Sequence, residues 1–248
     1  MEIRFTARKE LHLLAISHFL TEETSTPYVG WESRIIEVGE LIKSNYGWVS
    51  VVVRGVFDGG GDLRLNGIDA LGSAELEGWG RIRQVLDGLA RQATLAYEDL
   101  KERLDEFIEG SFRKGCKPEK VAVALSYWGG VKAPKCVRFG REENSLALYA
   151  LVDSSVTPQE LVDCVLASVV KDGLRRCMLG GEEIIEEVTK ALAPAGHLSR
   201  YLGLLLSEPI GSGSVWEAVK KYVKERKFKE IDIATYLLDF LGRGVKLG

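Results

Sequence analysis

The stretch from Ser145 to Lys171 constrains the fold more than any other part of the chain. An unbroken apolar run from Leu146 to Val152 ends at Asp153, and apolar residues with helical spacing follow between Thr157 and Gly173. Such a run, without polar alternation, is typical of a strand that is buried on both faces of a sheet. We therefore predict a buried strand, a polar turn and a capped helix, a junction at which clefts form in α/β proteins.

The other predicted elements are unevenly distributed along the chain. Their composition and periodicity predict strands at 2–6, 48–57, 121–128 and 137–139, with 63–65 as a hairpin partner of 48–57. Helices are predicted at 8–20, 31–43, 75–113, 182–192, 198–206, 215–224 and 233–241. Strands mainly within residues 1–153 and a helical C-terminal part indicate an α+β fold, or a mixed α/β fold. We expect a core domain over 1–175 and a helical subdomain over 176–248.

The long helical pattern from Glu75 to Arg113 raises the question of what covers it. A continuous helix of this length would span about 57 Å, which exceeds an ordinary domain. Glycines at 78, 80 and 88 allow a break that would give a compact monomer. Without a break, the apolar stripe needs a second chain to cover it. That stripe comprises Ile82, Leu86, Leu89, Leu100 and Leu104.

Charge and hydropathy restrict the partners of the chain. The net charge is −3 and the pI is about 5.8, which disfavours a nucleic-acid-binding protein. The segment from Lys220 to Lys229 is the exception, because it holds six Lys and Arg residues. No apolar stretch is long enough to span a membrane, and residues 1–20 lack the features of a signal peptide. We expect a cytoplasmic protein, and its few Asn, Gln and Met residues are typical of a thermophile.

The four cysteines, Cys116, Cys136, Cys164 and Cys177, fit no zinc-binding spacing. We expect free, partly buried thiols. A Cys116–Cys136 disulfide is left open, because such bonds also occur in intracellular proteins of hyperthermophiles.

A magnesium site is the only cofactor site that the sequence leaves open. Asp153, Ser155 and Thr157 form a D-x-S-x-T spacing directly after the apolar run, and their oxygens are ligands that suit Mg²⁺. Asp58 ends another predicted strand, so its carboxylate would join Asp153 in one cleft if the two strands were parallel neighbours. The alternative is ordinary turn chemistry, with Thr157 and Glu160 forming a capping box.

No catalytic motif is present, so the catalytic residues stay unknown. His12, His18 and His197 have no Ser or Cys partner that spacing would identify. The glycine-rich segment 210–214 lacks the Lys-Ser/Thr pair of a phosphate loop, and Ser214 with Glu217 predicts a second capping box.

These observations favour a protein that acts by protein–protein interaction in a homo-oligomer or larger assembly, through the 75–113 helix. Two alternatives remain open. One is a divalent-metal-dependent enzyme that uses Asp58 and Asp153, and the other is a nucleic-acid-associated protein that uses residues 220–229.

Overall fold

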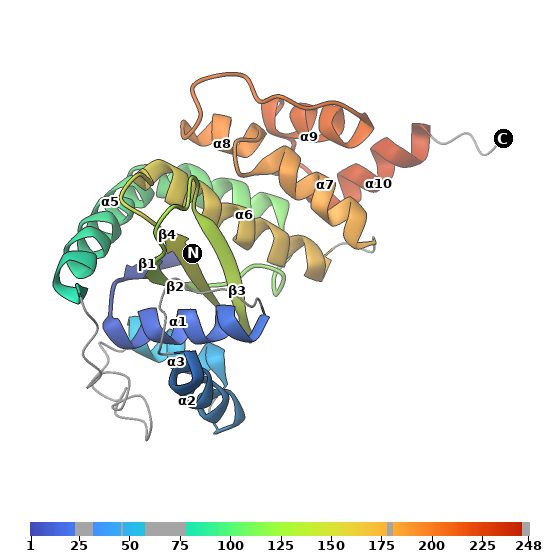
Figure 1. Cartoon of the computed structure of the whole chain (residues 1–248). Coiled ribbons are helices and arrows are strands. Elements are labelled where there is room, and N and C mark those ends of the chain that lie inside the picture. Colours follow the sequence, from blue (N-terminus) through green and yellow to red (C-terminus); the bar gives the residue numbers. More distant parts are fainter. Residues whose placement is uncertain (23–31, 46, 58–77, 178–180, 245–248) are drawn as a thin grey trace. The chain divides into compact units, whose positions relative to one another are not determined.

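A mixed sheet together with many helices confirms the α+β class (Figure 1). The structure is a computed structural model that describes residues 1–22, 32–45, 47–57, 78–177 and 181–244. The strands are β1 (Glu2–Thr6), β2 (Lys120–Tyr127), β3 (Lys135–Glu142) and β4 (Ser145–Val152). The helices are α1 (Lys9–Glu22), α2 (Glu32–Asn45), α3 (Trp48–Phe57), α5 (Trp79–Ser111), α6 (Pro158–Cys177), α7 (Glu182–Leu192), α8 (His197–Leu202), α9 (Ser214–Lys224), the 3-10 turn η1 (Lys227–Lys229) and α10 (Ile233–Gly244).

The chain forms two compact units. Unit 1 comprises residues 1–95 and 119–161, and unit 2 comprises residues 96–118 and 162–248. Within the described residues, no helix is both long enough and apolar enough to cross a membrane.

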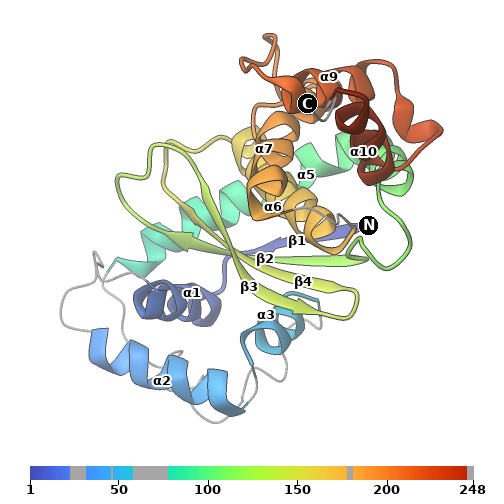
Figure 2. The same ribbon diagram turned by 90° about the vertical axis from the view of Figure 1, so that its right-hand side faces the viewer.

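The sheet of unit 1 has the strand order β1-β2-β4-β3. β1, β2 and β4 run parallel, and β3 pairs antiparallel to β4 at one edge. β4 thus lies between two strands, as its unbroken apolar sequence predicts. Helices α1 and α3 pack on one face of the sheet, and α2 packs on α1 (Figure 2). Residues of the opposite face, such as Val123 and Leu148, are buried as well.

Residues 48–57 form helix α3, so the prediction of a strand there is wrong. The segment is rich in valine, which favours strands. Its buried residues, however, are Trp48, Val51, Val52 and Gly55, a helical spacing that lays one face on the sheet. The packing of this face outweighs the local β preference. The predicted hairpin partner 63–65 and Asp58 lie outside the described residues.

Helix α5 is continuous, with no break at Gly88. Most of its predicted stripe is buried within the chain itself, because Leu86, Leu89, Leu100 and Leu104 are in the core, while Ile82 is half-buried. The expectation that a second chain must cover this stripe is therefore wrong. The large apolar side chain that α5 does expose is Leu95, which is 67% exposed.

Unit 2 is built on the second half of α5 and on helices α6 to α10. Phe107 of α5 packs edge-on against Phe228 of η1, with ring centroids 5.3 Å apart. Gly110 is required there, because a Cβ atom would lie 1.9 Å from the Phe228 carbonyl oxygen. Lys171 and Arg175 of α6 form ion pairs with Glu182 at the start of α7.

Candidate functional site

The predicted magnesium ligands at the end of β4 lie in a turn whose polar side chains form hydrogen bonds with one another and with the nearby backbone. The Asp153 Oδ1 atom accepts hydrogen bonds from the Ser155 N–H at 2.8 Å and from the Ser155 hydroxyl at 2.6 Å. These bonds lower the pKa of Asp153 below its ordinary value. Thr157 lies apart from them in the predicted capping box, where its Oγ1 accepts the Glu160 N–H at 3.2 Å. Asp58 is outside the described residues, so the shared carboxylate cleft stays a prediction.

No group of three or more His, Cys, Asp or Glu side chains in the described ranges could hold a metal ion. A cleft does lie outside the carboxyl end of β1. It has a volume of about 340 Å³, and its lining includes Arg8, Trp79, Arg83 and Asp87. Its arginines form ion pairs with acidic neighbours, at 3.6 Å for Arg8–Glu10 and 3.2 Å for Arg83–Asp87. This cleft therefore carries charges of both signs.

His12 joins α1 to the end of β2, a contact that no sequence spacing could reveal. Its Nδ1 atom lies 3.0 Å from the Ser126 hydroxyl oxygen and accepts the Tyr127 N–H at 3.3 Å. A backbone N–H can only donate, so the ring proton is on Nε2 and the ring is neutral. Complete burial lowers the pKa of His12 to about 3. Because Ser126 is also fully buried, this pair joins α1 to the sheet inside the core.

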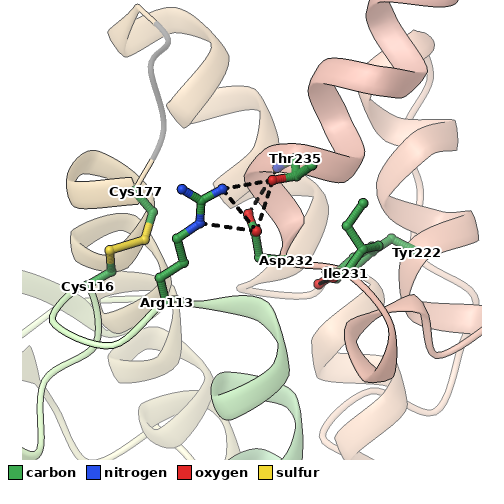
Figure 3. A network of polar contacts seen from close by, with 7 residues as sticks. All are labelled: Arg113, Cys116, Cys177, Tyr222, Ile231, Asp232 and Thr235. Atoms are coloured by element: carbon green, nitrogen blue, oxygen red, sulfur yellow. Dashed lines mark hydrogen bonds and ion pairs between the residues drawn. A yellow bond between two sulfur atoms is a disulfide. The ribbon is translucent and has the colours of Figure 1, made fainter.

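The cysteines form bonds that differ from both expectations. Cys116 is bonded to Cys177, with their Cα atoms 5.7 Å apart (Figure 3). None of the four cysteines is a free thiol. The prediction of a Cys116–Cys136 disulfide is therefore wrong. Pairing depends on which segments meet in space, and the spacing of cysteines along the chain does not determine it.

A polar network next to this disulfide anchors the start of α10 (Figure 3). Arg113 donates to the Asp232 Oδ2 atom from Nε and Nη2, both at 3.2 Å, and to the Thr235 Oγ1 atom at 2.9 Å. Asp232 accepts the Thr235 N–H at 3.0 Å and so caps the helix. Burial alone would raise the pKa of Asp232, but the bonds from Thr235 and Arg113 outweigh burial and lower it.

The basic segment 220–229 forms a surface of mixed charge. Four of its six cations contact acidic or aromatic neighbours within unit 2, while Lys221 and Lys224 are exposed on α9. The nucleic-acid alternative therefore has less positive charge available for phosphates than the sequence suggested. The four contacts are Lys220–Glu217, Lys227–Glu230, Lys229–Glu106 and the cation–π contact of Arg226 with Tyr201.

The most exposed apolar side chains of the described residues lie between α8 and α9. The α8–α9 loop (Gly203–Gly213) carries Leu206, which is 88% exposed, and Ile210, which is 98% exposed. The predicted helix 198–206 was too long, because Gly203 adopts a left-handed conformation with φ of 85° and ends α8 at Leu202. The leucines at 204–206, which were predicted to lie on a helix, therefore belong to this loop. Figure 1 shows the loop between α8 and α9.

Backbone hydrogen bonds hold the beginning of the α8–α9 loop. The N–H groups of Leu204 and Leu205 both donate to the Ser199 carbonyl oxygen, at 2.9 and 3.3 Å. Ser199 is itself fixed, because its hydroxyl donates to the buried Asp163 carboxylate at 2.5 Å. The exposed apolar residues thus follow a well-anchored segment.

The end of the α8–α9 loop rests on Trp216 of α9. A Cβ atom at position 211 would lie 2.4 Å from the Trp216 ring, so only glycine allows this close approach. The other support of Trp216 is His197 at the start of α8, with ring centroids 4.8 Å apart. The capping box predicted for Ser214 and Glu217 is absent, because Gly213 is the N-cap residue and no side chain caps it.

His197, for which sequence spacing identified no partner, is buried beneath this loop. Its side chain is only 7% exposed, and its Nε2 atom has no hydrogen-bond partner among the described residues. Burial is the main cause that lowers the pKa of His197, and Lys220 adds to the effect, whereas Glu208 and Glu217 oppose it. The ring is therefore neutral at neutral pH.

Comparisons of the chain with protein-family models, with curated proteins and with solved structures gave no match.

Proposed function

We propose that this protein acts by protein–protein contact as a subunit of a homo-oligomer, and that the α8–α9 loop makes the contact. The observation that carries this proposal is the exposure of Leu206 and Ile210, at 88% and 98%. Burying one side chain of this kind contributes about 1.5–3 kcal/mol. Two copies that meet at this loop would bury four of them, which is a substantial share of what a stable interface needs.

The charges around the loop favour a second copy of this chain as the occupant. Glu208 of the loop and Glu217 of α9 lie near Leu206 and Ile210 in sequence, and the exposed Lys221 and Lys224 follow on the same helix. In a twofold dimer a surface meets its own copy. A surface that carries both signs can then place its carboxylates opposite the ammonium groups of the other copy, while the apolar residues meet in the centre.

Helix α5 is not part of the proposed interface. Most of its apolar stripe is buried within the chain, and Leu95 is a single exposed leucine. A single apolar residue on a surface is common and needs no partner.

Light scattering during size-exclusion chromatography tests the proposal. The wild type is expected to be a dimer or larger, and a Leu206→Asp, Ile210→Asp double variant is expected to be a folded monomer. Leu95→Asp is the matched control, because it places the same charge on another exposed leucine, and this variant should keep the mass of the wild type. A monomeric wild type at high micromolar concentration would refute self-association.

Other partners of the α8–α9 loop are outcomes of the same experiments. Cosedimentation of a monomeric wild type with anionic vesicles, lost in the double variant, would assign the loop to a lipid surface. Salt-dependent retention on heparin would favour the nucleic-acid alternative. A thermal shift with Mg²⁺ or Mn²⁺ would favour the metal-dependent enzyme.

A cytoplasmic location in a thermophile is part of the proposal. The composition supports it, and a disulfide is compatible with it, because intracellular proteins of hyperthermophiles are often rich in disulfides.

A further inference from the structure

A neutral imidazole supports the loop that carries the proposed interface. His197 packs on Trp216, and Trp216 in turn carries Gly211 at a distance that excludes any side chain at that position. The position of the loop end therefore depends on the Trp216–His197 pair. A change that displaces this pair removes the contact that holds Gly211 at the end of the loop.

The surroundings of His197 accommodate its neutral form and penalise its charged form. The ring is 7% exposed, and its Nε2 atom has no acceptor among the described residues, so a second ring proton would be buried without a hydrogen bond. Leaving a buried charge without a partner is one of the largest penalties in a folded protein.

The charged groups that act on the ring come from two elements. Lys220 and Glu217 are on α9, and Glu208 is on the α8–α9 loop itself. Helix α7 also packs against α8, and the charged groups that shift the pKa of His197 most come from α9 and the loop. Glu208 and Glu217 favour the charged ring, and in the buried position its Nε2 proton has no acceptor among the described residues.

On the basis of the proposed function, we infer that protonation of His197 releases the α8–α9 loop from Trp216 and so dissociates the homo-oligomer. His197 is then a switch that permits self-association at neutral pH and prevents it in acid.

The direction of the pH effect follows from the position of the ring. Burial lowers the pKa of His197 below its ordinary value of 6.5, so the folded state with its loop in place binds fewer protons than the released state. The loop is therefore fully attached to Trp216 above pH 6.5, and its attachment weakens as the pH falls through the lowered pKa of His197.

Amide hydrogen exchange of residues 210–213, at the end of the loop that contacts Trp216, tests the inference in the full chain. At about pH 7.5, wild type and His197→Phe should exchange at equal rates, because both rings are neutral. At about pH 5, the wild-type loop should exchange roughly ten times faster than the loop of His197→Phe. A comparison at the same pH cancels the intrinsic pH dependence of exchange. His197→Asn, which also cannot be protonated, is the second variant should phenylalanine not fit.

Light scattering at the same two pH values completes the experiment. Wild type should dissociate in acid, while the variant that cannot be protonated stays assembled. Two results would overturn the inference. One is equal loop exchange in wild type and His197→Phe at about pH 5, and the other is a released loop in a complex that stays assembled. A wild type that is monomeric at neutral pH would refute the proposed function, and the exchange comparison would still decide whether His197 controls the loop.

Discussion

The hydroxyl of Ser199 donates a hydrogen bond of 2.5 Å to the buried carboxylate of Asp163, and this bond fixes the first turn of α8. The second carboxylate oxygen accepts the Ala195 N–H at 2.8 Å. Ala195 and Ser199 precede the α8–α9 loop in the chain. The Asp163 side chain of α6 therefore holds the segment that leads into the proposed interface.

Asp163→Ala should therefore destabilise the protein by about 2–3 kcal/mol, because two buried donors lose their acceptor. Chemical denaturation of the variant and of the wild type measures this difference. Asp163→Asn is the matched control, because it keeps the size and one acceptor oxygen, and it should lose less. An Asp163→Ala variant as stable as the wild type would contradict this role.

The pH dependence of the same pair has a defined sign. Burial raises the pKa of Asp163 above its ordinary value of 3.8, against the opposing effect of the bonds from Ser199 and Ala195. The folded state therefore binds the Asp163 proton more tightly than the unfolded state does. The stability that this proton adds to the fold is fully present below pH 3.8 and is lost as the pH rises through the raised pKa. The difference in unfolding free energy between wild type and Asp163→Asn should grow in acid. A pH-independent difference would show that Asp163 titrates alike in both states.

The Cys116–Cys177 bond, which joins residues 61 positions apart, should contribute strongly to stability. Restricting an unfolded loop of this length is worth about 4 kcal/mol in the chain-entropy model. Cys177→Ser should lower the melting temperature under oxidising conditions. Cys116→Ser is expected to give the same loss, and the double variant should lose no more than either single one. Additive losses would mean that the cysteines stabilise the fold separately.

The start of α10 should depend more on its cap than on its ion pair. The Arg113 side chain is 64% exposed, so Arg113→Ala should lose about 0.5–1 kcal/mol or less. Asp232→Ala removes the acceptor of the Thr235 N–H and should lose about 1–2 kcal/mol. Chemical denaturation ranks the two variants, and a larger loss for Arg113→Ala would reverse this assignment.

The capping box at the start of α6 was predicted from the sequence and is present. Thr157→Ala should destabilise the protein by about 1 kcal/mol through the loss of the cap. Ser154→Ala, at an exposed position of the same turn, is the control and should have little effect on the midpoint of denaturation. Equal midpoints for both variants would show that the cap adds nothing.

The sequence predicted best where local signals agree. The run from Leu146 to Val152 has a length and composition that fit only a buried strand, and the Thr157–Glu160 cap is specified within four residues. Helix α3 could not be predicted in this way, because its valines favour a strand and the packing of one helical face on the sheet decides against it.

The candidate site was beyond the sequence for a related reason. The leucines at 204–206 continue a helical pattern, and only the left-handed backbone at Gly203 moves them into a loop. The contact of His197 with Trp216 joins two helices across that loop, so no spacing identifies it. Such contacts depend on tertiary packing, which short-range patterns do not encode.

Hydrogen exchange of the amides of residues 204–208 and 210, measured at neutral pH over a series of protein concentrations, tests the proposed self-association most directly. If the loop meets a second copy, its amides become better protected as the concentration rises, in step with the mass from light scattering. In the Leu206→Asp, Ile210→Asp variant, the exchange of the same amides should not depend on concentration. Loop exchange in the wild type that is independent of concentration, in a protein with the mass of a monomer, would contradict the proposal.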